Sequence, residues 1–157
     1  ELIEEMICEE YSVGKQLGQG ATGEVYEVIH KGSKQKYALK ISKAKEIIRQ
    51  EASLMRSMEC KVFPYFYDYG EGDLGYLIME YLEGRNLQEI LDEGIVFEVE
   101  EAVWIVGEVL KGLGFLRRQN PALVYRDLKP ANIIIEKSGI FIPPFIIIQK
   151  NILDFFH

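Results

Sequence analysis

Asp127, Lys129 and Asn132 carry the strongest chemical signal, because they share the polar segment YRDLKPAN between two apolar runs. A carboxylate can accept a hydroxyl proton, an ammonium group can neutralise phosphate charge, and an amide oxygen can bind Mg²⁺. A simple turn between two strands has no need of this combination. The segment therefore predicts phosphoryl-transfer chemistry.

A second segment, with Gly18, Gly20 and Gly23, lies between two predicted strands. Glycine lets the backbone turn tightly and brings bare N–H groups close to phosphate oxygens. On its own the pattern is weak, because a glycine-rich hairpin without a ligand has the same sequence. A Rossmann dinucleotide site is disfavoured, because there a helix follows the glycines, whereas here a Val-rich strand is expected.

Lys40 lies on an alternating strand, on the face opposite to its apolar side chains. Such a lysine is normally exposed to solvent. However, Glu51 lies within the apolar stripe of a helix predicted at about residues 43–58, where a carboxylate needs a partner. Glu46 and Glu59 lie off that stripe, so we expect Lys40 to pair with Glu51.

The remaining pattern predicts the elements that must position these groups. Extended segments are expected at residues 11–18, 24–31, 35–42, 62–69 and 76–81, and helices at 43–58, 86–92 and about 98–119. The buried stripe of the last helix is expected at Ala102, Val106, Val109, Leu113 and Leu116. Strands with one helix, followed mostly by helices, predict an α+β fold in two lobes.

Composition indicates an acidic globular chain. The 157 residues are 48% hydrophobic, and 18 basic against 25 acidic side chains give a formal charge of -7, which disfavours a nucleic-acid binder that relies on bulk charge. Two cysteines, Cys8 and Cys60, are too few for a disulfide scaffold and indicate a reducing compartment, so a cytoplasmic location is expected. No apolar run approaches the ~20 residues of a membrane span, so no membrane segment is expected.

The glycine-rich segment, the strand lysine, the helix glutamate and RDLKPAN occur in the order of the protein kinase family, over about residues 11–135. The chain resembles this family, and more particularly its bacterial serine/threonine members. The resemblance implies an N-terminal antiparallel sheet lobe with one helix, followed by the beginning of a helical lobe. It also implies ATP and Mg²⁺ as cofactors and transfer of the γ-phosphoryl to a Ser or Thr hydroxyl of a protein substrate, since Lys129 is the serine/threonine-type residue.

The resemblance assigns roles to single residues. Asp127, Lys129, Lys40 and Glu51 are the implied catalytic residues, with Lys40 on the α/β-phosphates, and Asn132 is the implied metal ligand. Met79 corresponds to the gatekeeper, backbone groups of Glu80 and Leu82 are expected at the adenine edge, and Asn86 at the ribose. The residues implied around the nucleotide are Leu17, Gly18, Gly20, Gly23, Val25, Ala38, Lys40, Met79, Glu80, Leu82 and Asn86.

The domain organisation follows from the resemblance. Residues 1–10 are expected to be an extension, 11–83 the sheet lobe and hinge, 84–139 a partial helical lobe, and 140–157 a divergent tail in place of the Asp-Phe-Gly region. Tyr125 replaces the usual His before Arg-Asp, which is expected to remove a packing and hydrogen-bonding residue. Pro143 and Pro144 interrupt the last expected strand. We interpret Asp154-Phe155-Phe156 as a coincidence; the alternative is an insertion that carries a degenerate Asp-Phe-Gly.

These departures lead us to expect slow or no phosphoryl transfer by this chain. The alternative function is a pseudokinase-like module that binds nucleotide or a protein, and a third interpretation is an unstable gene remnant. The tail is interpreted as either a shifted or truncated kinase gene product or the end of a natural short protein. Its Ile and Phe side chains are expected to be exposed unless a partner covers them.

Overall fold

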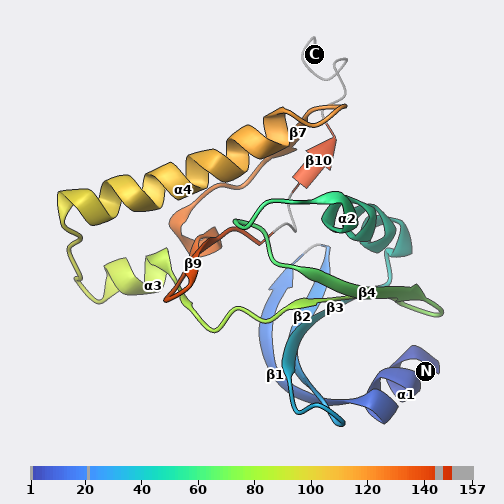
Figure 1. The fold of residues 1–157 in the computed structure, drawn as a ribbon. Coiled ribbons are helices and arrows are strands. Elements are labelled where there is room, and N and C mark those ends of the chain that lie inside the picture. Colours follow the sequence, from blue (N-terminus) through green and yellow to red (C-terminus); the bar gives the residue numbers. More distant parts are fainter. Residues whose placement is uncertain (1, 21, 144–146, 150–157) are drawn as a thin grey trace. The chain divides into compact units, whose positions relative to one another are not determined.

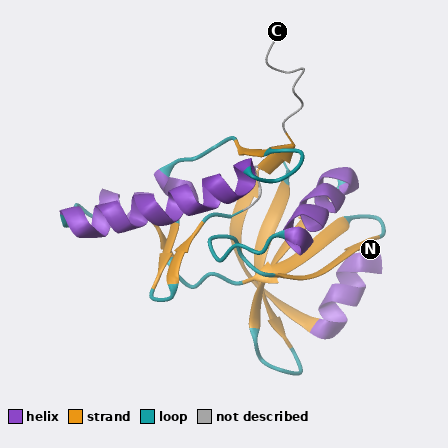
Figure 2. Ribbon diagram, turned by 45° about the horizontal axis from the view of Figure 1, so that its top comes forward, coloured by secondary structure: helices purple, strands orange, loops and turns teal. Residues whose placement is uncertain are grey.

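The computed structural model describes residues 2–20, 22–143 and 147–149. The chain divides into two compact units, Glu1–Met58 with Pro64–Tyr81 and Glu59–Phe63 with Leu82–His157. Each unit contains both helices and strands, which Figure 2 colours by type. The predicted α+β class is confirmed.

The first unit is built on a five-stranded antiparallel sheet with the order β1-β2-β3-β5-β4 (Figure 1). The strands are β1 (Tyr11–Gly20), β2 (Gly23–His30), β3 (Lys36–Ser42), β4 (Phe66–Glu71) and β5 (Gly75–Glu80). The strand expected at 62–69 is shorter than predicted, because Val62 and Phe63 lie in a turn and are buried in the second unit. Their apolar character reflects core packing and not a place in the sheet.

Among the residues that the structure describes, the first unit has two helices, where one was predicted. The additional helix is α1 (Leu2–Glu10), in the stretch expected to be an extension. Its Ile7 is 6% exposed and packs in a core cluster with Val28, Leu39 and Ile78. Lys31 N also donates to Glu10 O at 2.8 Å, so α1 is a structural part of this unit.

The second helix of this unit is α2 (Lys45–Ser57), which contacts β3, β4 and β5. Its buried residues are Ile48, Glu51, Ala52 and Met55. Glu51 contacts Lys40 of β3, whereas Ile7 of α1 packs with Leu39, the neighbouring residue of the same strand. Because neighbouring strand residues point to opposite faces, α1 and α2 cover opposite faces of the sheet.

The described residues of the second unit form two small sheets and several helices. One sheet has the order β6-β8-β9, and the other pairs β7 with β10. The elements are β6 (Arg85–Asn86), α3 (Leu87–Asp92), α4 (Val99–Arg117), β7 (Leu123–Tyr125), the 3-10 helix η1 (Pro130–Asn132), β8 (Ile134–Glu136), β9 (Gly139–Phe141) and β10 (Ile147–Gln149).

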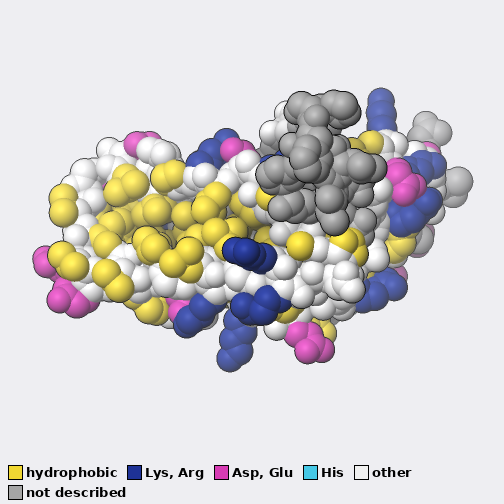
Figure 3. Space-filling model, turned by 90° about the horizontal axis from the view of Figure 1, so that it is seen from above, with side chains coloured by type: hydrophobic (Ala, Val, Ile, Leu, Met, Phe, Trp, Pro, Cys, Tyr) yellow, Lys and Arg dark blue, Asp and Glu magenta, His cyan; other side chains and the backbone are white. Residues whose placement is uncertain are grey.

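The buried side of α4 agrees with the predicted stripe at Val109 and Leu116 but not at its N-terminal positions. Ile105, Val109, Gly112 and Leu116 are the buried residues, whereas Ala102 is exposed and Val106 is 56% exposed. The helix is apolar on more than one side, so periodicity alone does not identify the side that packs inward. Hydrophobic side chains consequently gather on the surface along α4 (Figure 3), among them Val99, Val103, Val106 and Leu110.

The start of the tail is packed, whereas we expected its apolar side chains to be exposed. Ile140, Phe141 and Ile142 are at most 9% exposed, and Ile142 N donates to Val62 O at 2.7 Å within the second unit. Strand β9 ends before Pro143, in agreement with the predicted interruption. Asp154 and the apolar residues around it lie outside the described residues. Among the helices of the described chain, none is both long and apolar enough to cross a membrane.

Candidate active site

The expected ion pair between Lys40 and Glu51 is present in the first unit. Lys40 Nζ lies 2.7 Å from both Glu51 Oε1 and Glu51 Oε2. The side chains are only 1% and 7% exposed. A third contact was not predicted: Lys40 Nζ donates to Thr22 Oγ1 at 3.0 Å. The lysine therefore joins α2 to the glycine-rich hairpin.

Burial controls the ionisation of this pair. Desolvation lowers the pKa of Lys40 and raises the pKa of Glu51, because both charged forms lose water. The ion pair and its hydrogen bonds oppose both shifts. Each charge thus depends on the other.

The glycine-rich segment forms the turn between β1 and β2. Gly20 pairs with Gly23 in the antiparallel register, so the ladder extends close to the turn. Gly23 has φ +137, and a Cβ built on it would lie 2.3 Å from Ile41 O, so the position requires glycine. At Gly18 and Gly20 an added Cβ meets open space. These two glycines leave bare backbone at the surface, as a phosphate-covering turn needs.

The other residues implied around the nucleotide in this unit differ in burial. Ala38 and Met79 are register partners, 6% and 1% exposed, and Val25 is paired with Lys40. Leu17 is 41% exposed. Glu80 N donates to Tyr65 O at 2.8 Å, so this N–H is used within the protein.

Leu82 and Asn86 belong to the second unit. Asn86 is the N-cap of α3, and its Oδ1 accepts from Glu89 N at 2.9 Å. Glu89 returns a hydrogen bond to Asn86 N at 3.2 Å, which completes a capping box. The structure thus gives Asn86 a helix-capping function that the sequence did not predict.

The RDLKPAN segment brings its three polar side chains together within the second unit. Lys129 Nζ lies 2.9 Å from Asp127 Oδ2. Asn132 Nδ2 donates to Asp127 O at 2.8 Å and to Asp127 Oδ2 at 3.2 Å. Asp127 and Lys129 remain 45% and 52% exposed. An oriented, accessible carboxylate next to a cation suits proton acceptance beside a phosphate.

The donor set near Asn132 fits one ligand of a divalent cation. Because its amide nitrogen is engaged with Asp127, its amide oxygen remains as a hard ligand of the kind that Mg²⁺ prefers. The described part of the chain holds no group of three or more His, Cys, Asp or Glu side chains arranged for a metal.

Tyr125 does not have the effect that we expected. It was predicted to remove a packing and hydrogen-bonding residue, yet it is 8% exposed and its hydroxyl donates to Pro143 O at 2.9 Å. Burial raises the pKa of its hydroxyl, and the charge of Asp127 adds to this. The tyrosine supplies both packing and a hydrogen bond in its own way, by connecting β7 to the segment after β9.

Comparison with known proteins identifies the family of this chain. The model of the protein kinase domain matches residues 11–155, which extends beyond residue 135, where we expected the resemblance to end. The serine/threonine-protein kinase greatwall of Xenopus tropicalis is 31% identical over 140 residues, which cover 83% of this chain and 16% of that protein. Rho-associated protein kinase 1 of Homo sapiens is 30% identical over 145 residues, 85% of this chain and 10% of that protein.

A bacterial relative has a similar identity. The probable serine/threonine-protein kinase pknA2 of Bifidobacterium longum is 31% identical over 147 residues, 86% of this chain and 19% of that protein. Animal and bacterial relatives match equally well, so the expected bacterial affiliation is not singled out. The chain spans less than a fifth of the length of each of these relatives. The family model and the relatives agree: this chain belongs to the protein kinase family.

Proposed function

We propose that this chain carries the ATP-binding unit and the catalytic loop of a protein serine/threonine kinase. The buried pair of Lys40 and Glu51 is the single observation that supports this most strongly. A fully buried lysine is rare and costly unless it is paired, so its position on the face that α2 covers calls for a function. A fixed cation joined to a glycine hairpin by Thr22 suits the phosphates of ATP.

The catalytic loop supplies the second half of the proposal. Asp127 accepts the proton of a Ser or Thr hydroxyl, and Lys129 neutralises charge on the phosphoryl group. Asn132 orients Asp127 through its amide nitrogen and offers its amide oxygen to Mg²⁺. The metal, when bound, neutralises phosphate charge. We place the protein in the cytoplasm, where its two free thiols, Cys8 and Cys60, stay reduced.

ATP binding tests the first unit. A fluorescent ATP analogue titrated with Mg²⁺ is expected to bind the unmodified chain saturably, and Lys40→Met should weaken binding at least about tenfold by removing a charge-assisted contact. Lys36→Met is the matched control, since Lys36 lies on the same strand but is 44% exposed. Equal affinity of Lys40→Met and the unmodified chain would contradict the proposal, as would the absence of saturable binding.

Phosphoryl transfer tests the catalytic loop. With γ-labelled ATP and a generic protein acceptor, any transfer by this chain is expected to be slow and Mg²⁺-dependent, with label on Ser or Thr that is lost in Asp127→Asn. Asp92→Asn is the control, because Asp92 is a surface carboxylate at the end of α3. Label that persists in Asp127→Asn, or that appears only on Tyr, argues against the assigned roles.

A further inference from the structure

We propose that Arg49 and Glu71 are positioning residues for Glu51, because their contact anchors α2 to the β4–β5 hairpin and so holds the Glu51 carboxylate against Lys40. This inference rests on the proposed function of Lys40 as a phosphate-binding residue. Neither Arg49 nor Glu71 was singled out by the sequence.

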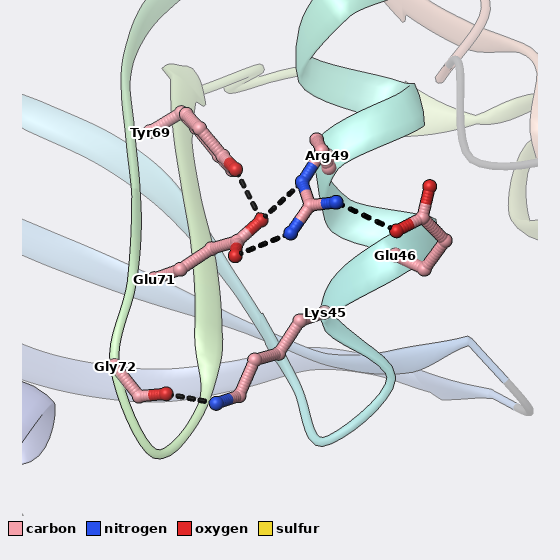
Figure 4. A network of polar contacts seen from close by, with 6 residues as sticks. All are labelled: Lys45, Glu46, Arg49, Tyr69, Glu71 and Gly72. Atoms are coloured by element: carbon pink, nitrogen blue, oxygen red, sulfur yellow. Dashed lines mark hydrogen bonds and ion pairs between the residues drawn. The ribbon is translucent and has the colours of Figure 1, made fainter.

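The contact is a bidentate ion pair between Arg49 and Glu71, which we call the fork. Arg49 Nε donates to Glu71 Oε1 and Arg49 Nη2 donates to Glu71 Oε2, both at 2.8 Å (Figure 4). Two parallel hydrogen bonds from a planar guanidinium fix orientation as well as distance. The hydroxyl of Tyr69 also donates to Glu71 Oε1, and Arg49 Nη1 donates to Glu46 at 2.8 Å. Glu71 therefore accepts from both Arg49 and Tyr69, and Arg49 is held in turn by Glu46.

The helix connects the fork with the buried pair. Arg49 and Glu51 belong to the same helix α2, which moves as one body when it rotates or slides. Glu51 links the helix to β3, and Arg49 links it to the end of β4. A movement that withdraws Glu51 from Lys40 has to break or strain the fork.

The start of α2 shows why an outside anchor is useful. Its N-cap residue is Ala44, which makes no side-chain cap hydrogen bond. In the first turn, Lys45 Nζ donates to Gly72 O in the turn between β4 and β5 (Figure 4). The hairpin therefore holds the helix through two residues, Lys45 and Arg49. Helix ends without caps tend to fray, and these contacts oppose that.

The anchor stays charged over the physiological range. Arg49 and Tyr69 hold the pKa of the Glu71 carboxyl at about 2, and Glu71 in turn raises the pKa of Arg49. Lys45 adds a smaller lowering of the Glu71 pKa. The fork therefore acts as a permanent connection and not as a pH-dependent one.

The first test needs no nucleotide. Amine acetylation followed by mass spectrometry gives the labelling rate of Lys40 relative to exposed Lys36. Arg49→Ala and Glu71→Gln are expected to increase the Lys40 rate about threefold or more, because the pair opens more often. Glu46→Gln is the matched control, since it removes an Arg49 partner but leaves the fork to Glu71 intact.

A variant that only lowers stability distinguishes a loss of Glu51 positioning from a general destabilisation of the first unit. Ile7→Ala removes core packing under α1 without touching α2, so it should leave the Lys40 rate unchanged well below its melting temperature. Unchanged labelling in Arg49→Ala and Glu71→Gln would overturn the proposal. An increase of the Lys40 labelling rate in Ile7→Ala as large as that in Arg49→Ala would also overturn it.

A coupling experiment then addresses the proposed function. Arg49→Ala should weaken ATP binding about threefold to tenfold in the unmodified chain but have no effect in a Glu51→Gln background, because it acts through Glu51. Equal effects in both backgrounds contradict positioning. If the unmodified chain binds no ATP, the proposed function fails, and Lys40 labelling alone decides the anchor.

Discussion

Lys40 Nζ lies 2.7 Å from both carboxylate oxygens of Glu51, and both side chains are almost fully buried. Neither charge has enough water to remain stable alone. The two residues therefore form one unit in energetic terms, and removing one of them should change the ionisation of the other.

Lys40→Met should lower the free energy of unfolding by about 3–5 kcal/mol at neutral pH, because it leaves a buried carboxylate unpaired. The pKa of Glu51, already raised by burial, should rise further. A folded state that holds a proton above the unfolded pKa loses stability as pH increases, so the variant should weaken above about pH 4.5. Urea unfolding across pH measures this. The control Lys40→Met with Glu51→Gln should lose the added pH dependence.

Glu71→Gln should change how the free energy of unfolding depends on pH in acid. The pKa of Glu71 is lowered to about 2, so its contribution to folding is present above the unfolded pKa and is lost as pH falls toward 2. The difference in urea midpoint between the unmodified chain and Glu71→Gln should therefore be constant near neutral pH and shrink below about pH 4.5. In an Arg49→Ala background the pH-dependent difference should nearly vanish; if it persists, Arg49 is not its cause.

Gly23→Ala should destabilise the first unit by about 1–3 kcal/mol, because an alanine there is strained and collides with Ile41 O. Gly20→Ala is the matched control, since a Cβ at Gly20 meets open space. Denaturant unfolding followed by circular dichroism compares the two variants. Equal stability of both would contradict the observed turn.

Ile7→Ala should cost about 2–5 kcal/mol, because it leaves a cavity beside Val28 and Leu39. Cys8→Ser, at an exposed neighbouring position, should have little effect. The free energy of unfolding from urea titration distinguishes them. If Ile7→Ala is as stable as Cys8→Ser, α1 does not contribute to the core of the first unit.

Tyr125→Phe should lower stability by about 1 kcal/mol, because the carbonyl of Pro143 loses its hydrogen-bond donor. Tyr65→Phe serves as control, since Tyr65 is 66% exposed. The sole tryptophan, Trp104, lies in the second unit and reports its unfolding by fluorescence. Identical midpoints for the two variants would show that the hydroxyl of Tyr125 is not important for stability.

Much of the fold and part of the site could be predicted because the signals are local. Strand alternation placed Lys40 opposite the apolar face, and helix periodicity placed Glu51 in the apolar stripe, so their pairing followed from two short windows. The RDLKPAN segment is continuous, and its three polar side chains meet within a single turn and 3-10 helix.

Other predictions failed where more than one packing fits the same pattern. Helix α4 is apolar on several sides, and only its neighbours in the second unit determine that Ile105 and not Val106 is buried. Val62 was placed in a strand for a similar reason, because a short apolar run suits a strand and a buried turn equally well.

The sequence by itself determined the family, most of the strand and helix order, and the residues proposed for phosphate chemistry, because each depends on neighbouring positions in the chain. Only the tertiary structure decided that Ile7 packs in the core and that Thr22 contacts Lys40. It also decided that Arg49 hydrogen-bonds to Glu71 and that Tyr125 donates a hydrogen bond to Pro143 O. In each of these contacts the partners lie far apart along the chain. Arg49 and Glu71 look like ordinary surface charges in the sequence, and folding alone brings them within hydrogen-bond distance.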